Sequence, residues 1–190
     1  HYGLQVSSDG GSTWLNRTSQ LPYSDVHAAG LDPATPQHLY AYLVGMGVYG
    51  SSDLGASWQL IGGADLQLMG PLVVTAGGHD LLANDMMQGI VGSHDGGVTW
   101  SPVSPAQQTM WLTADPQTPS HLLMVGQFLS ESRDDGVTWQ PLQAPLGVSA
   151  ATIAPSRNGV RIWYSAALEN GGAVVYSSQD EGKDWQRMTA

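Results

Sequence analysis

Five copies of one eight-residue pattern, S-x-D-x-G-x-x-W, run through this 190-residue chain and limit what it can fold into. They read SSDGGSTW, SSDLGASW, SHDGGVTW, SRDDGVTW and SQDEGKDW, and they begin at residues 7, 51, 93, 132 and 178. The intervals of 44, 42, 39 and 46 residues match a structural repeat of about 40–50 residues, the length of a unit of four short strands. Two further segments, LDPATPQHLY and ADPQTPSHLL, recur at similar offsets, 24 and 21 residues after the start of a copy. The chain is therefore expected to be an array of repeated antiparallel sheets.

Apolar and β-branched runs bounded by Gly, Pro, Asn and Asp predict four strands in each repeat, termed A to D. In the second repeat we expect them near 26–31, 38–43, 47–52 and 57–62, with the pattern in the C–D hairpin. The first repeat supplies only C and D, near 2–8 and 13–18. The expected fold is all-β: a β-propeller of four-stranded antiparallel blades, about 4.5–5 of them, or a fragment of a larger ring. We divide residues 1–190, taken as a single domain, into a half blade (1–22) and four blades (23–63, 64–105, 106–144 and 145–190).

The pattern resembles the Asp-box, or BNR repeat, of β-propellers. That group includes sialidases, xyloglucan-degrading glycosidases, sortilin-type receptor domains and photosystem assembly propellers. The resemblance covers essentially the whole chain and implies the propeller fold. Because enzymes, receptors and assembly factors share this fold, the function has to be argued from a site.

The residues that recur in every copy of the pattern, here called a box, are expected to be structural. The Asp carboxylate can accept N–H groups of a tight turn, Gly at position five supplies a positive φ, and Trp covers the hairpin against the neighbouring blade. These residues are Asp9, Asp53, Asp95, Asp134, Asp180, Trp14, Trp58, Trp100, Trp139 and Trp185. The other two tryptophans, Trp111 and Trp163, are expected in the core.

The net charge of −10 excludes several classes of partner. Six Lys and Arg residues against sixteen Asp and Glu residues leave no surface for nucleic-acid phosphates or for an anionic membrane. No apolar run approaches the roughly 20 residues of a membrane span. The chain has no cysteine. We expect no cofactor and no metal.

Ligand sites are expected on the face opposite the boxes, which we call the loop face because the D–A and B–C loops form it. The resemblance places such sites around the mouth of the central channel. Aligning the starts of the A strands sets His27 roughly level with Gly70, Met110 and Ser149. The ligand-binding candidates on this face are Tyr23, His27, Met46, Asn84, Met86 and Gln127. The catalytic candidates are Asp25, Asp85 and Glu169, and Asp25 with Asp85 is the first pair to test as two glycosidase carboxylates.

Two residue types on the loop face allow alternative readings. A hydrogen-bonded core position is favoured for His27 over a ligand role. Thioethers beside His27 could bind a soft ion, but methionine as a flexible filler is the favoured interpretation. The methionines concerned are Met46, Met69, Met86, Met87 and Met110.

A non-catalytic propeller that binds a protein or carbohydrate partner through its loop face is the favoured function. The alternative is a glycoside hydrolase of Asp-box type. A sialidase needs three arginines around the substrate carboxylate, and the five arginines here lie on box-face turns and outer strands. No nucleic acid and no membrane insertion are expected, and the location expected is extracellular or periplasmic, as in an exported bacterial-type protein. The strands missing from the first blade would come from sequence absent here or from another chain.

Overall fold

The computed structural model describes residues 3–75, 80–103, 109, 111–157 and 159–189. The secondary structure of these residues is β-strand, apart from the short 3-10 helix η1 (Thr18–Gln20). In this part of the chain, no helix is long and apolar enough to cross a membrane. The chain divides into two compact units, His1–Met87 with Gly92–Ser101, and Gln88–Val91 with Pro102–Ala190.

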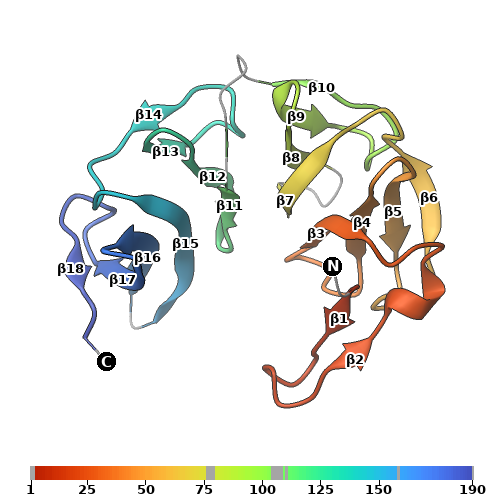
Figure 1. Cartoon of the computed structure of the whole chain (residues 1–190), viewed down its shortest axis with the longest axis horizontal. Helices are drawn as coiled ribbons and strands as arrows, with labels where there is room; N and C mark the ends of the chain where they lie inside the picture. The colour runs from red at the N-terminus through yellow and green to blue at the C-terminus, as the bar shows by residue number, and fades with distance from the viewer. Residues whose placement is uncertain (1–2, 76–79, 104–108, 110, 158, 190) are drawn as a thin grey trace. The chain divides into compact units, whose positions relative to one another are not determined.

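The half blade consists of β1 (Gln5–Val6) and β2 (Leu15–Asn16), which form a two-stranded antiparallel sheet. The next blade is β3 (Val26–Leu31), β4 (Leu39–Leu43), β5 (Gly47–Ser51) and β6 (Gln59–Gly62), paired antiparallel in that order. It is followed by β7 (Leu68–Val74), β8 (Leu81–Asp85), β9 (Gly89–Ser93) and β10 (Ser101–Pro102). Figure 1 shows these strands.

The first strands of these two blades pair with each other. β3 and β7 run parallel, with Ala28 opposite Gly70 and Ala29 opposite Pro71, and they join the blades into one sheet of order β10-β9-β8-β7-β3-β4-β5-β6. Gly30 permits this approach, because a Cβ there would overlap the carbonyl oxygen of Leu72. Small residues on β3 thus bring the two inner strands together.

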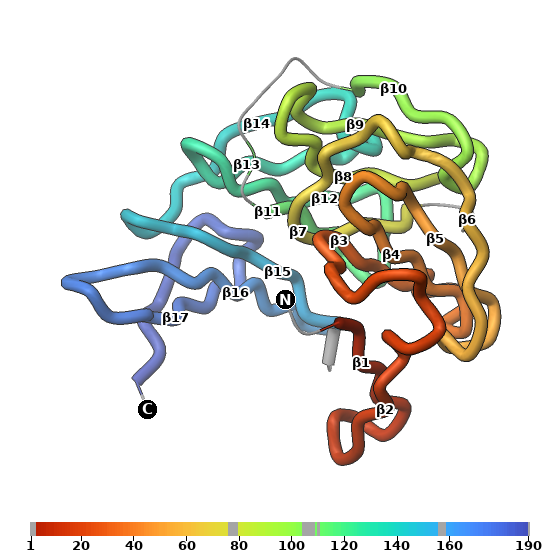
Figure 2. Tube along the Cα trace, turned by 45° about the vertical axis from the view of Figure 1, so that its right-hand side comes forward, coloured from red at the N-terminus to blue at the C-terminus, as the bar shows by residue number. Residues whose placement is uncertain are grey.

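The second unit contains two separate four-stranded antiparallel sheets, whose trace can be followed in Figure 2. One comprises β11 (Trp111–Asp115), β12 (Thr118–Val125), β13 (Leu129–Ser132) and β14 (Gln140–Pro141). The other comprises β15 (Val148–Arg157), β16 (Val160–Glu169), β17 (Gly172–Ser178) and β18 (Gln186–Arg187). The two pack on a shared core that includes Leu123, Ile153 and Trp163.

The expected fold class is confirmed: the described residues form an all-β protein of four-stranded antiparallel blades. Trp163 is buried in the core, as expected. Trp111 differs from the expectation, because it lies exposed at the first position of β11. The expected strand containing Met110 falls partly outside the described residues.

All five boxes fold into the same hydrogen-bonded turn. In the third box, Ser93 Oγ donates to Asp95 Oδ1 at 2.8 Å and accepts the Gly97 N–H at 2.8 Å. Asp95 Oδ1 also accepts the Thr99 N–H at 2.9 Å, and Asp95 Oδ2 accepts the Thr99 hydroxyl at 2.6 Å. Trp100 Nε1 donates to the Gly97 carbonyl at 2.9 Å. The indole therefore closes the turn with a polar bond as well as covering it.

Two features of the box were not anticipated from the sequence. Position seven carries a hydroxyl that donates to the box Asp in four copies, at Thr13, Ser57, Thr99 and Thr138. Position four, like the glycine after it, has a positive φ, and three copies place a non-glycine residue there: Leu54, Asp135 and Glu181, with φ of 56°, 57° and 60°. The box turn therefore depends on two successive left-handed residues.

Each of three boxes packs against the last strand of the blade before it. A Cβ on Gly55 would lie 3.0 Å from the Arg17 side chain, just after β2. A Cβ on Gly62, in β6, would lie 2.9 Å from the carbonyl oxygen of Gly97. Trp185 Nε1 donates to the carbonyl of Gln143 at 2.9 Å, just after β14. Box hairpins therefore join neighbouring blades at their outer strands.

The box turns make acid sensitivity an expected property of the fold. Hydrogen bonds from the residue at position seven lower the pKa of Asp9, Asp53 and Asp95 to about 2. Since the folded pKa lies below the unfolded one, these carboxylates stabilise the fold above pH about 4, and this stabilisation is lost as the pH falls towards 2. The urea midpoint, measured by circular dichroism, should be level from pH 7 to about 5 and fall between about 4 and 2.

Thr99→Val tests the cause of this acid sensitivity, because it removes the largest contribution to the lowered pKa of Asp95. The variant should show a shallower acid slope than the wild type, whereas Val98→Ala, one residue earlier, should keep the wild-type slope. A midpoint that is unchanged between pH 4 and 2 would contradict the prediction.

Candidate functional site

The loop-face candidates of the first unit meet where β3 and β7 begin and β8 ends. His27 Nε2 lies 3.2 Å from Asp25 Oδ1, and His27 Nδ1 lies 3.1 Å from Met69 Sδ. The register explains the second contact, because Ala28 pairs with Gly70 and this sets His27 beside Met69. The register thus differs by one residue from the rough alignment of His27 with Gly70. Met110, the third residue of that alignment, lies outside the described residues.

Asp85 is a buried carboxylate whose oxygens hold two main-chain segments. Asp85 Oδ2 accepts the N–H of Gln67 at 2.6 Å, and Oδ1 accepts the N–H of Met87 at 2.8 Å. Asp85 thus ties the loop before β7 to the turn after β8. Asp25 instead faces the imidazole of His27. The two acids expected as a catalytic pair are thus directed at different groups.

Among the remaining candidates, Glu169 and Gln127 lie in the second unit, and Asn84 lies in β8 of the first unit. Glu169, at the end of β16, accepts a hydrogen bond from the Tyr176 hydroxyl, and this bond raises the pKa of Tyr176. Arg187 Nη2 lies 3.7 Å from Glu169 Oε2. Gln127 is exposed in the turn between β12 and β13, and Asn84 is buried beside Asp85. Glu169 is therefore part of a cluster within its own blade.

Large apolar side chains are exposed in the D–A loops and B–C turns, or at the strand ends beside them, in both units. In the first unit, Met86 and Met87 are 65% and 74% exposed in the β8–β9 turn, and Tyr23 is 54% exposed in the loop before β3. The other members of this set are Val44, Met46, Phe128, Leu146 and Leu168. Apolar side chains are also exposed elsewhere, for example at Leu60, Val98 and Val137. The methionine and tyrosine side chains are the members of this set best suited to a binding surface.

A buried charge network in the second unit was missed by the sequence analysis. Asp115 Oδ2 lies 2.6 Å from Arg161 Nη1 and 3.6 Å from His121 Nδ1. His121 Nε2 lies 3.1 Å from Glu131 Oε2, which also contacts Arg133. Asp115 Oδ1 accepts the N–H of Gln117 at 2.8 Å, so the same carboxylate caps the β11–β12 turn. The network joins strands of two neighbouring blades.

A signal for part of this network is present in the sequence. The segments LDPATPQHLY and ADPQTPSHLL place a His six residues after an Asp. In the first of them, Asp32 Oδ1 accepts the N–H of Ala34 at 2.8 Å and Asp32 Oδ2 lies 3.9 Å from His38 Nδ1. The repeated Asp and His therefore mark a capped A–B turn. In the second segment, Arg161 also contacts the Asp and Glu131 also contacts the His.

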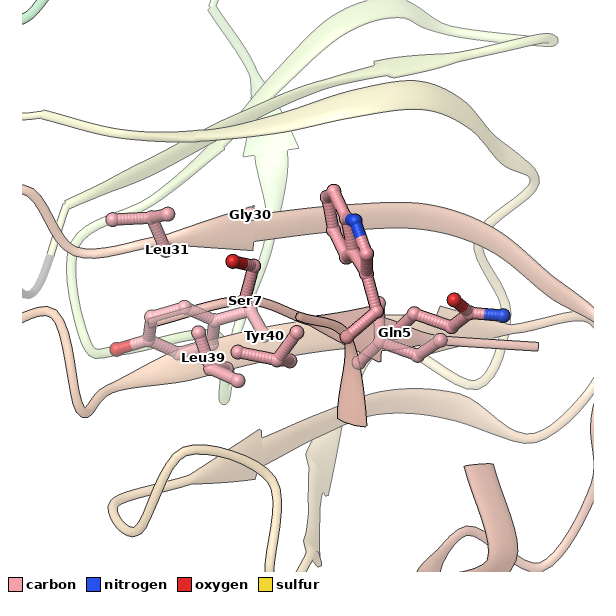
Figure 3. Close-up of a pocket in the computed structure, with 10 residues that line it drawn as sticks. Gln5, Ser7, Gly30, Leu31, Leu39 and Tyr40 are labelled. Carbon is pink, nitrogen blue, oxygen red and sulfur yellow. The ribbon is translucent and has the colours of Figure 1, made fainter. Parts of the chain in front are cut away.

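A pocket of about 360 Å³ lies between the half blade and β3–β4, away from the loop-face candidates. Figure 3 labels Gly30, Leu31, Leu39 and Tyr40 of β3 and β4, and Gln5 and Ser7 of the half blade, among the residues that line it. Leu4, Val6, Trp14 and Ala29 complete the lining. The pocket lies beside β1, the strand at position C of the half blade.

Comparison with known proteins supports the fold. No protein-family model and no curated protein matches the chain. Among solved structures, it resembles the GH74 enzyme of Niastella koreensis with a TM-score of 0.68 and 16% identity, over 98% of this chain and 34% of that enzyme. YCF48 from Cyanidioschyzon merolae gives 0.59 and 14%, over 87% and 56% of the two chains. The Hadza microbial sialidase Hz136 gives 0.58 and 18%, over 95% and 50%. The chain thus spans between about a third and just over half of the length of these propellers.

Proposed function

We propose that this chain is a non-catalytic propeller segment that binds a protein partner through its loop face. The observation that carries the proposal is the set of exposed apolar side chains on the D–A loops and B–C turns, above all Tyr23, Met86 and Met87. Thioether side chains adapt to the shape of a partner because they are unbranched and polarisable. A tyrosine beside them offers a rigid contact with one polar end.

The arrangement of the acids supports binding over catalysis. A two-carboxylate glycosidase needs both groups directed at one substrate bond, about 5–10 Å apart. Both oxygens of Asp85 accept main-chain N–H groups, and Glu169 is engaged with Tyr176 and lies near Arg187. These carboxylates already have structural partners. Asp25, beside His27, is the remaining acid for the glycoside hydrolase alternative.

A similar propeller supports a protein ligand over a carbohydrate. YCF48 has also been solved bound to the D1 peptide, and that structure resembles this chain with a TM-score of 0.57 and 16% identity. The loop face of the first unit offers methionine and valine side chains beside Tyr23, a composition suited to an apolar peptide. The net charge of −10 favours a partner with basic residues around that apolar segment.

The experiment is a selection of random displayed peptides on the purified chain, followed by fluorescence anisotropy with synthetic copies of the selected peptides. We expect peptides with apolar residues flanked by Lys or Arg. Met87→Asp and Tyr23→Asp should each weaken binding about tenfold or more, as at the centre of an interface. Val98→Asp, which introduces the same charge at an exposed residue of a box hairpin, should leave the affinity unchanged.

Three outcomes would overturn the proposal. The first is that Val98→Asp weakens binding as much as Met87→Asp does. The second is turnover of an aryl glycoside that is lost in Asp25→Asn, which would establish the hydrolase alternative. The third is binding on a glycan array, lost in Tyr23→Asp, without any peptide binding. Circular dichroism on each variant separates loss of binding from loss of fold.

We further infer that the pocket beside β1 receives the strands that complete the first blade. In the four full blades, the strand at position C lies next to the strand at position B, as β5 lies next to β4. The pocket lined by Leu31, Leu39 and Trp14 offers apolar surface beside β1. These strands would come from the same protein or from another chain.

A further inference from the structure

Two electron-pair donors face each other at the start of β3 and β7. His27 Nδ1 lies 3.1 Å from Met69 Sδ, and the opposite ring nitrogen, Nε2, lies 3.2 Å from Asp25 Oδ1. The neutral imidazole carries its single proton on one of the two ring nitrogens. With the proton on Nε2, the Nδ1 lone pair is directed at the thioether sulfur. A carboxylate behind an imidazole is also the arrangement that orients histidine ligands in metal sites.

The register of β7 and β8 brings a second thioether to the same side. Met69 pairs with Asn84, and Leu68 pairs with Asp85. Met86 continues this pairing, since its N–H donates to the Gln67 carbonyl at 3.0 Å. Residues 67 and 69 are exposed while Leu68 between them is buried. Met69 and Met86 are therefore diagonal neighbours on one face, which also carries the buried Asn84. Diagonal neighbours lie about 7–8 Å apart, within reach of long side chains.

The exposure of these methionines argues against the filler role favoured from the sequence. Met69 and Met86 are 40% and 65% exposed, whereas a side chain that fills a gap in the core is covered. Their exposure also leaves both thioethers able to move towards an ion arriving from solvent. His27 is more enclosed, since about 20% of its side chain is exposed.

We propose that His27, Met69 and Met86 form a binding site for a soft monovalent cation, Cu(I), for which Ag(I) is a probe. Thioether and imidazole ligands select Cu(I) over the hard cations that prefer oxygen. In the described part of the chain, no three His, Asp or Glu side chains are grouped as ligands for another metal. The ion would bind between Nδ1 and the two sulfur atoms, with Asp25 orienting the ring through Nε2.

The test is anaerobic titration of the chain with Cu(I) in competition with a chromophoric Cu(I) chelator. We expect one equivalent to bind. Met69→Leu and Met86→Leu, which conserve volume, should each weaken binding by at least about tenfold, since even outer-shell changes cost about 10–100-fold. Asp25→Asn should weaken binding about 10–100-fold, the usual effect of changing a residue that orients a metal ligand. Met188→Leu, at an exposed methionine just after β18, is the matched control and should bind as the wild type does.

A second measurement keeps the proposal testable if a variant folds poorly. On addition of one equivalent of Ag(I) to the wild type, NMR should show shifts of the His27 Nδ1 resonance and of the Met69 and Met86 ε-methyl resonances, with Met188 unchanged. Equal weakening by Met188→Leu, absence of competition with the chelator, or an unshifted His27 Nδ1 would each overturn the proposal. Peptide binding through Tyr23 and Met87 is measured without metal, so the two proposals succeed or fail separately.

Discussion

Trp163→Ala is expected to lower the free energy of unfolding by about 4 kcal/mol. Trp163 is one of the largest fully buried side chains, and it packs in the core with Leu123 and Ile153. Its ring also lies beneath the fifth box, because a Cβ on Gly182 would lie 3.1 Å from it. The substitution would therefore leave a cavity in the core and remove the support of a box turn.

Urea unfolding followed by far-UV circular dichroism measures this loss. Trp163→Phe keeps an aromatic ring at the same place and should lose less than half as much stability. Trp111→Ala is the matched control, since this tryptophan is exposed on β11, and its effect should stay within about 1 kcal/mol. An equal loss in Trp111→Ala, or a loss below about 1 kcal/mol in Trp163→Ala, would show that Trp163 is not central to this core.

Asp115→Ala is expected to cost about 2 kcal/mol, because it removes a fully buried carboxylate that pairs with a partly exposed arginine and caps a turn. The fully buried carboxylate receives Arg161 at 2.6 Å and the Gln117 N–H at 2.8 Å. Its removal would leave the guanidinium without this acceptor and uncap the β11–β12 turn. It would also remove the carboxylate that lies 3.6 Å from buried His121.

The equivalent turn of another blade provides the control. Asp32→Ala removes the same cap, but His38 is half-exposed and 3.9 Å away, so the loss should be nearer about 1 kcal/mol. A double-mutant cycle of Asp115→Ala with Arg161→Met isolates the ion pair, and its coupling energy should exceed about 1 kcal/mol. Equal losses at Asp115 and Asp32 would indicate that only the cap contributes.

The fold could be predicted because its repeating element is local. Eight residues of each box contain the acceptor, donor, glycine and indole that the turn uses, as the bonds of Ser93, Asp95 and Trp100 illustrate. Contacts between blades are not encoded in this way. The pairing of Ala28 with Gly70 depends on how closely β3 approaches β7 at Gly30, which no pattern within either strand expresses. That is why the expected level of His27 differed by one residue.

The candidate site was only partly predictable for a related reason. The sequence placed Asp85 on the loop face, beside the β8–β9 turn. It could not distinguish an acidic residue that binds a substrate from one that accepts two main-chain N–H groups. The Asp115 network was missed because Arg161 lies 46 residues away in the sequence and Glu131 lies on a different strand. Such groups meet only once the blades have packed.

The contact between a box and the preceding blade also bears on how such chains can change over time. At the junction of β6 with the third box, the closest approach to Gly62 is made by the carbonyl oxygens of Gly97 and Val98, and these main-chain atoms are present in any sequence. The contact therefore requires a residue without a side chain at position 62, but it depends on main-chain atoms alone on the side of the box. A duplicated or exchanged blade could therefore form the same contact with its neighbour. The number of repeats can then change while the loop residues vary independently.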